Sequence, residues 1–191
     1  MRETSNTGLF KMTICGIDEL AGHVDACVTH VLSILDPTTP EPEAFSRYRV
    51  HERLELRFHD VIETDLPGYD PPQPHHVAAV LEFGRTMVTT AEPPPHLLVH
   101  CHMGISRSTA AAALVMAATM PDRGPADIMA EIARMRPKAW PNLRMIEIGD
   151  AMLDRGGSLI RAVRDRHREL ATALPQVASF MRDSGRAREL D

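Results

Sequence analysis

The chain has 191 residues, 43% of them hydrophobic and 25% charged, which are ordinary proportions for a globular protein with one core. The formal net charge of −5 argues against nucleic acid as a partner, because proteins that bind nucleic acid carry an excess of Lys and Arg. No apolar run is long enough to span a membrane, and the three cysteines lack the spacing of a metal site. We therefore expect a single cytoplasmic domain over residues 1–191, with no metal and no membrane contact.

Three strands are predicted in the first third of the chain, over residues 12–15, 27–35 and 54–58. The first two are rich in apolar and β-branched residues, as buried strands are. In the third, Leu54, Leu56 and Phe58 alternate with charged residues, which is the period of a half-exposed strand. The connection 60–74 is long, acidic and rich in proline, and such a loop inside a compact domain is often a lid over a site.

Helices are predicted through most of the second half. An Ala-rich run at 110–116 has high helix propensity, and Pro125 and Pro141 suit the first positions of two further helices. Residues 158–183 are expected to form a C-terminal helical extension, with its arginines on a solvated face. The remaining residues, 184–191, are expected to form a loose tail.

The most informative stretch runs from Leu97 to Thr109. It starts with a short apolar run, typical of a buried strand, and ends in the Ala-rich helix, with Gly104 between them able to adopt a positive φ. A turn between strand and helix aims successive backbone N–H groups at one point, and the helix N-terminus adds partial positive charge. Cys101 opens this turn and Arg107 closes it, so a thiol and a five-donor cation face a space that suits a phosphate group.

Residues 100–108 have the pattern His-Cys-x-x-Gly-x-Ser-Arg-Ser. This pattern resembles the motif of the cysteine-dependent protein tyrosine phosphatases, and of their dual-specificity branch in particular. Residues 29–33 also resemble a strand of that branch, and the likeness covers about residues 12–155. It implies an α/β fold with a central, twisted, mostly parallel sheet of four to five strands flanked by helices.

The resemblance also implies roles for individual side chains. Cys101 would attack phosphorus and carry the phosphoryl group as a phosphocysteine, while Arg107 grips the phosphate. Ser108 would stabilise the departing thiolate, and His100 would hydrogen-bond the backbone of the turn. The expected phosphate-binding residues are His102, Met103, Gly104, Ile105, Ser106 and Arg107. This chemistry needs no cofactor, and a phosphate or sulfate anion is the expected occupant of the turn.

The expected substrate is a phosphorylated protein or a small phosphomonoester. Phosphotyrosine is favoured, with phosphoserine and phosphothreonine left open, because the sequence does not give the depth of the pocket. The variable positions of the turn, His102, Met103 and Ile105, include no lysine. Lipid-phosphate members of the superfamily tend to carry basic residues there, so the sequence disfavours phosphoinositides.

In the phosphatase family an aspartate protonates the leaving group, and this chain offers three candidates. Asp60 directly follows the half-exposed strand, as the acid of the family does, and it is the favoured candidate. Asp70 is its rival, because its sequence distance from Cys101 is closer to the usual one. Asp65 ranks third.

Two other hypotheses stay open. One is a phosphate-binding or phosphopeptide-binding module without turnover, which the intact Cys101 and Arg107 disfavour. The other is different thiol chemistry, such as sulfur transfer or arsenate reduction. Arsenate reduction needs a resolving thiol, which only Cys15 or Cys27 could supply if it folded near Cys101.

Overall fold

The centre of the computed structural model, which describes residues 4–90 and 93–191, is a five-stranded sheet with the order β1-β2-β5-β3-β4. Its strands are β1 (Ser5–Asn6), β2 (Lys11–Cys15), β3 (His30–Leu35), β4 (Glu52–Arg57) and β5 (His96–His100). Only β1 runs antiparallel to its neighbour, and the other pairs are parallel. The expected mostly parallel sheet of four to five strands flanked by helices is confirmed.

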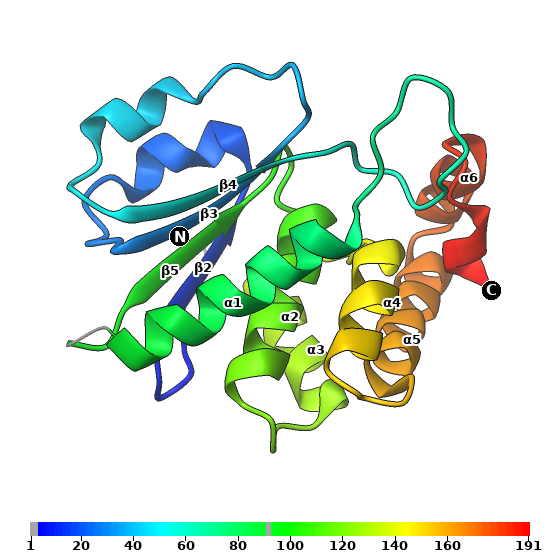
Figure 1. Ribbon diagram of the computed structural model, residues 1–191. Helices are drawn as coiled ribbons and strands as arrows, with labels where there is room; N and C mark the ends of the chain where they lie inside the picture. Colours follow the sequence, from blue (N-terminus) through cyan, green and yellow to red (C-terminus); the bar gives the residue numbers. More distant parts are fainter. Residues whose placement is uncertain (1–3, 91–92) are drawn as a thin grey trace.

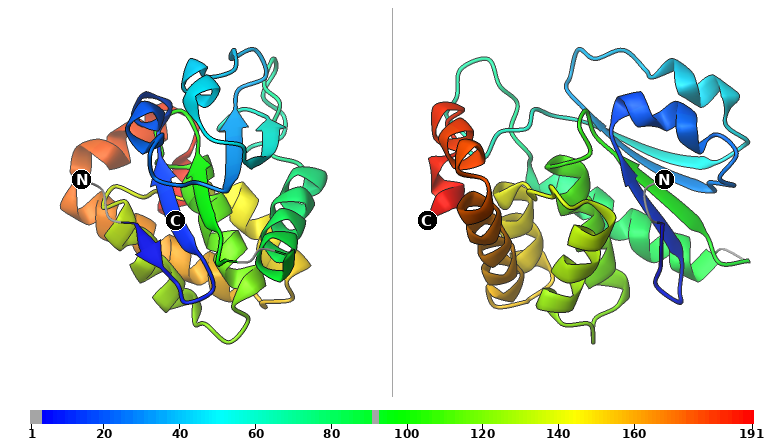
Figure 2. Two further views of the ribbon diagram at one scale, coloured as in Figure 1. Left: turned by 90° about the vertical axis from the view of Figure 1, so that its left-hand side faces the viewer. Right: turned by 180° about the vertical axis from the view of Figure 1, so that it is seen from behind.

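Helices cover both faces of the sheet unequally (Figures 1 and 2). Two short 3-10 helices, η1 (Ile17–His23) and η2 (Glu43–Arg47), lie on one face. A layer of longer helices packs on the other face. It contains α1 (Pro74–Thr90), α2 (Arg107–Thr119), α3 (Pro125–Met135), α4 (Leu143–Met152) and α5 (Ser158–Ala173), with α6 (Pro175–Asp183) and the 3-10 helix η3 (Ala187–Leu190) at its end.

The helix α2 lies at the centre of this layer, and its residues from Arg107 to Ala117 are all buried. Its alanines allow the neighbouring helices to approach closely. In α4, a Cβ on Gly149 would lie 2.1 Å from a terminal methyl of Leu114, so a larger residue at that crossing would force the Leu114 side chain to move. The start of α2, which carries Arg107, is therefore part of the buried centre of the helical layer.

The parallel strands β3, β4 and β5 all end at the same edge of the sheet. Asp36 follows β3, the segment Phe58–Asp60 follows β4, and Cys101 follows β5. In open α/β sheets this edge is where ligands bind, because the loops that follow the strands converge there. The long loop after β4 extends from this edge toward α6 (Figure 1).

Two expectations from the sequence need correction. The strand predicted over 27–35 begins only at His30, because Cys27 adopts a positive φ of 54° that no strand accommodates. Residues 184–191 do not form a loose tail: Arg186 and Glu189 are 7% and 0% exposed, and η3 packs on α5 and α6. The tail is ordered because these two charged side chains find buried partners.

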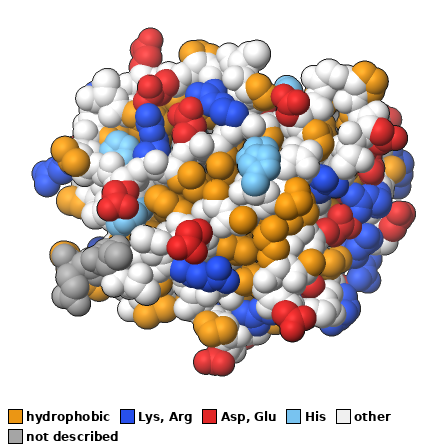
Figure 3. Space-filling view, in the orientation of Figure 1, with side chains coloured by type: hydrophobic (Ala, Val, Ile, Leu, Met, Phe, Trp, Pro, Cys, Tyr) orange, Lys and Arg blue, Asp and Glu red, His pale blue; other side chains and the backbone are white. Residues whose placement is uncertain are grey.

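Arg161 and Arg168 of the C-terminal extension are exposed, on the side where Lys and Arg side chains gather over α5 (Figure 3), whereas the side chain of Arg166 is only 10% exposed. They are paired rather than free: Arg166 contacts Glu169 at 2.7 Å and Arg168 contacts Asp165 at 2.6 Å. Within the described residues, no helix is both long enough and apolar enough to cross a membrane.

Candidate active site

The turn between β5 and α2, residues 101–107, forms what we call the cradle. Its carbonyl groups at positions 102–105 all accept hydrogen bonds from residues outside the turn. The donors are the backbone N–H of Ile17 to His102 (3.0 Å), Arg136 Nη2 to Met103 (2.8 Å), Arg136 Nε to Gly104 (2.9 Å) and the backbone N–H of Trp140 to Ile105 (2.9 Å). In a trans peptide the N–H points opposite to the C=O, so the amides of residues 103–106 point to the inside of the cradle. Within the described part of the chain these four amides have no hydrogen-bond partner.

Gly104 makes this geometry accessible. Its φ is +67°, and a Cβ at this position would lie within 2.5–2.7 Å of the Cys15 backbone and the Arg136 guanidinium. A side chain is excluded by both strain and contact. The sequence-based expectation of a positive φ at Gly104 is confirmed.

Cys101 lies at the mouth of the cradle, and its Sγ is 3.2 Å from Ser108 Oγ. Both side chains are buried, and Ser108 stands in the first turn of α2. A hydroxyl donor and a helix N-terminus both favour a sulfur that carries negative charge. The expected pairing of Cys101 with Ser108 is therefore present.

Arg107 is 3% exposed and is held at the carboxyl ends of β3 and β4. Its Nη1 donates to Asp36 Oδ1 at 2.6 Å and to the Phe58 carbonyl at 2.5 Å, while its Nε has no partner in the described structure. The Asp36 carboxylate thus pairs with the cation that a phosphate would need. Sequence analysis missed Asp36, since only the parallel arrangement of β3 and β5 brings it to the cradle.

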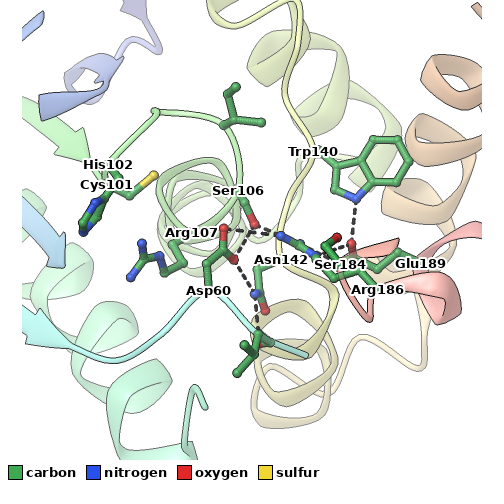
Figure 4. Close-up of polar contacts among 12 residues, drawn as sticks. Asp60, Cys101, His102, Ser106, Arg107, Trp140, Asn142, Ser184, Arg186 and Glu189 are labelled. Atoms are coloured by element: carbon green, nitrogen blue, oxygen red, sulfur yellow. Dashed lines mark hydrogen bonds and ion pairs between the residues drawn. The ribbon is translucent and has the colours of Figure 1, made fainter. Parts of the chain in front are cut away.

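Asp60 lies between the guanidinium groups of Arg107 and Arg186 (Figure 4). Its Oδ1 accepts from Ser106 Oγ at 2.7 Å and from Asn142 Nδ2 at 2.8 Å, and its Oδ2 is 3.3 Å from Arg186 Nη1. Burial acts to raise the pKa of Asp60, but Arg186, Arg107 and the two hydrogen bonds outweigh it and hold the pKa below the ordinary value. At neutral pH Asp60 is a carboxylate.

The two rival aspartates lie elsewhere on the loop. Asp70 pairs with His59 through backbone contacts, its N–H donating to His59 Nδ1 at 2.9 Å, and its side chain is exposed. Asp65 is also exposed. The cavity beside Cys101 is lined by Asp60 and by neither of these two.

That cavity has a volume of about 1010 Å³ and is walled mainly by apolar side chains. They come from the long loop (Val61, Leu66, Tyr69), the cradle (Met103, Ile105), the segment before α4 (Trp140) and the C-terminal helices (Leu170, Leu174, Val177, Phe180, Met181). Cys101 and Arg107 lie on its inner surface. A large apolar space therefore opens directly beside the cradle.

No family model matches the chain, and no curated protein matches it in sequence. Solved structures do match. Human DUSP28 is 16% identical over 80% of this chain and 93% of that chain, with a TM-score of 0.58. The phosphatase domain of Yvh1 from Chaetomium thermophilum is 20% identical over 83% and 98%, with a TM-score of 0.54. A mouse putative dual specificity phosphatase, crystallised in complex with zinc tungstate, is 15% identical over 81% and 87%, with a TM-score of 0.57. The chain has the dual-specificity phosphatase fold.

In this phosphatase fold the C-terminal segment contributes directly to the site. Glu189 accepts hydrogen bonds from Trp140 Nε1 at 2.7 Å, from the Leu143 N–H at 3.0 Å and from Arg186 Nε at 2.7 Å. Arg186 in turn donates to Ser106 Oγ at 3.0 Å. His167 stacks on Trp140 with ring centroids 4.2 Å apart, which fixes the indole that lines the cavity. Sequence analysis missed Arg186, Glu189 and Trp140, and no local pattern marks them.

His100 is fully buried at the end of β5, 5.5 Å from the Phe45 ring. Burial lowers its pKa to about 4, so it is neutral. A backbone contact with Cys101, the first residue of the turn, acts to raise this pKa but is outweighed by burial, and the expected role of His100 at the turn backbone stays a prediction. No group of three or more His, Cys, Asp or Glu side chains that would hold a metal ion occurs within residues 4–90 and 93–191.

Proposed function

We propose that this chain hydrolyses phosphomonoesters through a phosphocysteine at Cys101, with phosphotyrosine as its preferred substrate. The observation that carries the proposal is the ring of four unpartnered amides at 103–106, between a buried thiol and the start of α2. Unpaired N–H groups that converge on one point are costly unless an anion occupies that point. A phosphoryl group satisfies them, and its transfer to Cys101 requires little more than correct positioning and charge stabilisation.

The reaction has two steps. The Cys101 thiolate attacks phosphorus and the bond to the leaving oxygen breaks, while the amides of the cradle and Arg107 balance charge on the equatorial oxygens. For this, Arg107 exchanges its ion pair with Asp36 for the phosphate. Water then attacks the phosphocysteine, the S–P bond breaks, and Ser108 stabilises the thiolate that returns. Asp60, a carboxylate that lines the cavity, can accept the proton of the attacking water.

The apolar cavity supports an aryl phosphate as the substrate. An aromatic ring attached to the phosphate would contact the side chains of Tyr69, Met103 and Ile105 rather than solvent. The short chain of phosphoserine or phosphothreonine would leave much of this space unfilled. A free catalytic thiol also needs a reducing compartment, which agrees with the expected cytoplasmic location.

Hydrolysis of 4-nitrophenyl phosphate in the presence of EDTA tests the proposal. We expect turnover that Cys101→Ser abolishes. Cys27→Ser is the matched control, because Cys27 precedes β3 and so lies at the opposite edge of the parallel sheet from Cys101. Acid quenching during turnover should trap a phosphoprotein that the Cys101→Ser variant does not form.

Two results would overturn the proposal in different ways. Saturable binding of a phosphotyrosine peptide with no release of phosphate would indicate a silent binding module. Arsenate reduction that depends on both Cys101 and Cys15 would indicate thiol redox chemistry, because Cys15 is the other cysteine at this edge of the sheet.

A further inference from the structure

Arg186 joins the C-terminal segment to the two parts of the site that handle the phosphate and the proton. Its Nη1 contacts Asp60 at 3.3 Å and its Nη2 contacts Ser106, the last residue of the cradle before α2, at 3.0 Å. Two hydrogen bonds that Arg186 donates to the Glu189 carboxylate, from Nε at 2.7 Å and from Nη2 at 2.8 Å, fix the guanidinium in this orientation. Arg186 is 7% exposed and Glu189 is fully buried, so the arrangement is not a surface ion pair.

Every group that contacts the Asp60 carboxylate favours its ionised form. Ser106 donates to it instead of capping α2, and Asn142 donates to the same oxygen. Arg107 adds positive charge from the start of α2, and Arg186 adds it from the C-terminal segment (Figure 4). The other titratable groups that the described structure places along this cavity are Cys101 and His102 in the cradle, Tyr69 on the long loop, Lys138 before α4 and Asp183 at the end of α6. A carboxylate with two donors and two nearby guanidinium groups does not readily take up a proton.

We propose that Arg186 is a positioning residue that holds Asp60 as a carboxylate and thereby limits the enzyme to phosphomonoesters whose leaving groups depart as anions. The inference rests on the proposed phosphatase function. It adds a specificity determinant, because the departure of an oxide depends less on a proton the less basic the oxide is, and aryl oxides are much less basic than alkyl oxides. It also assigns a purpose to the buried C-terminal segment.

The reaction has two chemical steps, and the first of them, transfer of the phosphoryl group to Cys101, needs no general acid. The Cys101 thiolate forms the S–P bond, and the P–O bond breaks with its electron pair on the aryl oxide, which is protonated by solvent. In the second step water forms the new P–O bond and gives its proton to the Asp60 carboxylate. The S–P bond breaks with its electron pair on sulfur, and Asp60 then loses the proton to solvent.

The test compares kcat/KM for phenyl phosphate and 4-nitrophenyl phosphate, two substrates of similar shape whose leaving groups differ in basicity. The variant is the double substitution Arg186→Met with Glu189→Gln, which removes the cation without leaving a buried carboxylate unpaired. Each unit of increase in the pKa of Asp60 raises its protonated fraction about tenfold at a pH above that pKa. We expect the ratio of phenyl to 4-nitrophenyl phosphate activity to rise by roughly tenfold or more. The pH above which kcat/KM for phenyl phosphate falls should also be higher in the double variant than in the unmodified protein.

Three further variants test whether the change in the ratio depends on the charge at position 186 and on Asp60. Arg186→Lys keeps the charge and should restore the ratio of the unmodified protein. Asp60→Asn, added to the double variant, should remove the gain with phenyl phosphate. Arg164→Met is the matched control, because Arg164 contacts the carbonyl of Asp191 in the same segment but not the cavity.

An unchanged ratio and pH profile in a folded variant without the Arg186 charge would overturn the inference. Where the double variant does not fold, Arg186→Gln, which keeps donors for Ser106 and Glu189 without the charge, gives the same comparison. Absence of Cys101-dependent hydrolysis in the unmodified protein would instead be a failure of the proposed function.

Discussion

Replacing Arg136 by methionine tests whether the cradle depends on a buried guanidinium beneath it. Arg136 donates to the carbonyls of Met103 and Gly104 and forms an ion pair with Glu19 at 2.9 Å. These bonds turn the two carbonyls away from the cradle and so turn the amides inward. Methionine has similar length but offers no donor, so both carbonyls would lose their partner.

The size of the effect follows from these contacts. Arg136 is 7% exposed, and hydrogen bonds from a charged donor contribute about 1.5–3 kcal/mol each. Breaking a largely buried ion pair by removing one partner costs about 3–5 kcal/mol, and we expect a destabilisation of that size for Arg136→Met. With a urea slope of about 2–3 kcal/mol/M, the midpoint of unfolding should fall by about 1–2 M.

Arg134→Met is the matched control for this measurement. Arg134 lies on the same helix, its side chain is 42% exposed, and its ion pair with Glu131 is a surface contact of about 0.2–1 kcal/mol. The Arg136 variant should also show a raised KM for 4-nitrophenyl phosphate in buffer without urea. Equal urea midpoints and equal KM values for the two variants would refute the idea that Arg136 shapes the cradle.

Three other predictions concern the reacting groups and the neutral histidine beside them. Asp60→Asn should lower kcat for 4-nitrophenyl phosphate by about 10²-fold, whereas Asp70→Asn should change it less than about twofold; the reverse order would assign the role to Asp70. Ser108→Ala should slow phosphocysteine hydrolysis, so that stopped-flow traces show a burst of nitrophenol; a single slow phase without a burst would contradict the role of Ser108. The unfolded chain protonates His100 near pH 6.5 and the folded chain only at about 4, so stability is full above pH 6.5 and is lost as pH falls. Between pH 7 and pH 5 this loss is about 2 kcal/mol, and urea unfolding of His100→Gln should show a correspondingly smaller decline.

The parts of the site that sequence analysis predicted are encoded within a short stretch. The apolar run before Cys101, the glycine in the turn and the Ala-rich helix after it specify a strand, a turn and a helix by local preference alone. The structure agrees, with β5 ending at His100 and α2 beginning at Arg107. Such local patterns depend little on the rest of the fold, so they can be read from the sequence.

The parts that sequence analysis missed depend on contacts between distant segments. Asp36 reaches Arg107 only because β3 lies beside β5, and Arg136 reaches the cradle only because α3 ends below it. The segment 184–191 is polar and short, which is typical of a frayed terminus. Its order comes from Arg186 and Glu189, which pair with each other and also with Ser106 and Leu143, more than forty residues away in the chain.

The hydrogen bonds that distant residues donate to the carbonyl groups of the cradle explain why such contacts are needed. Four amide dipoles that point at one place repel one another, and without support the turn would rotate a peptide to satisfy them internally. Arg136 prevents this rotation on one side by binding two carbonyls. On the other side, Trp140 binds the Ile105 carbonyl while its indole is held by Glu189, which also holds Arg186 against Ser106. The C-terminal segment is thus part of the support that keeps the cradle open for an anion, and removing it should affect the binding of phosphate before it affects the sheet.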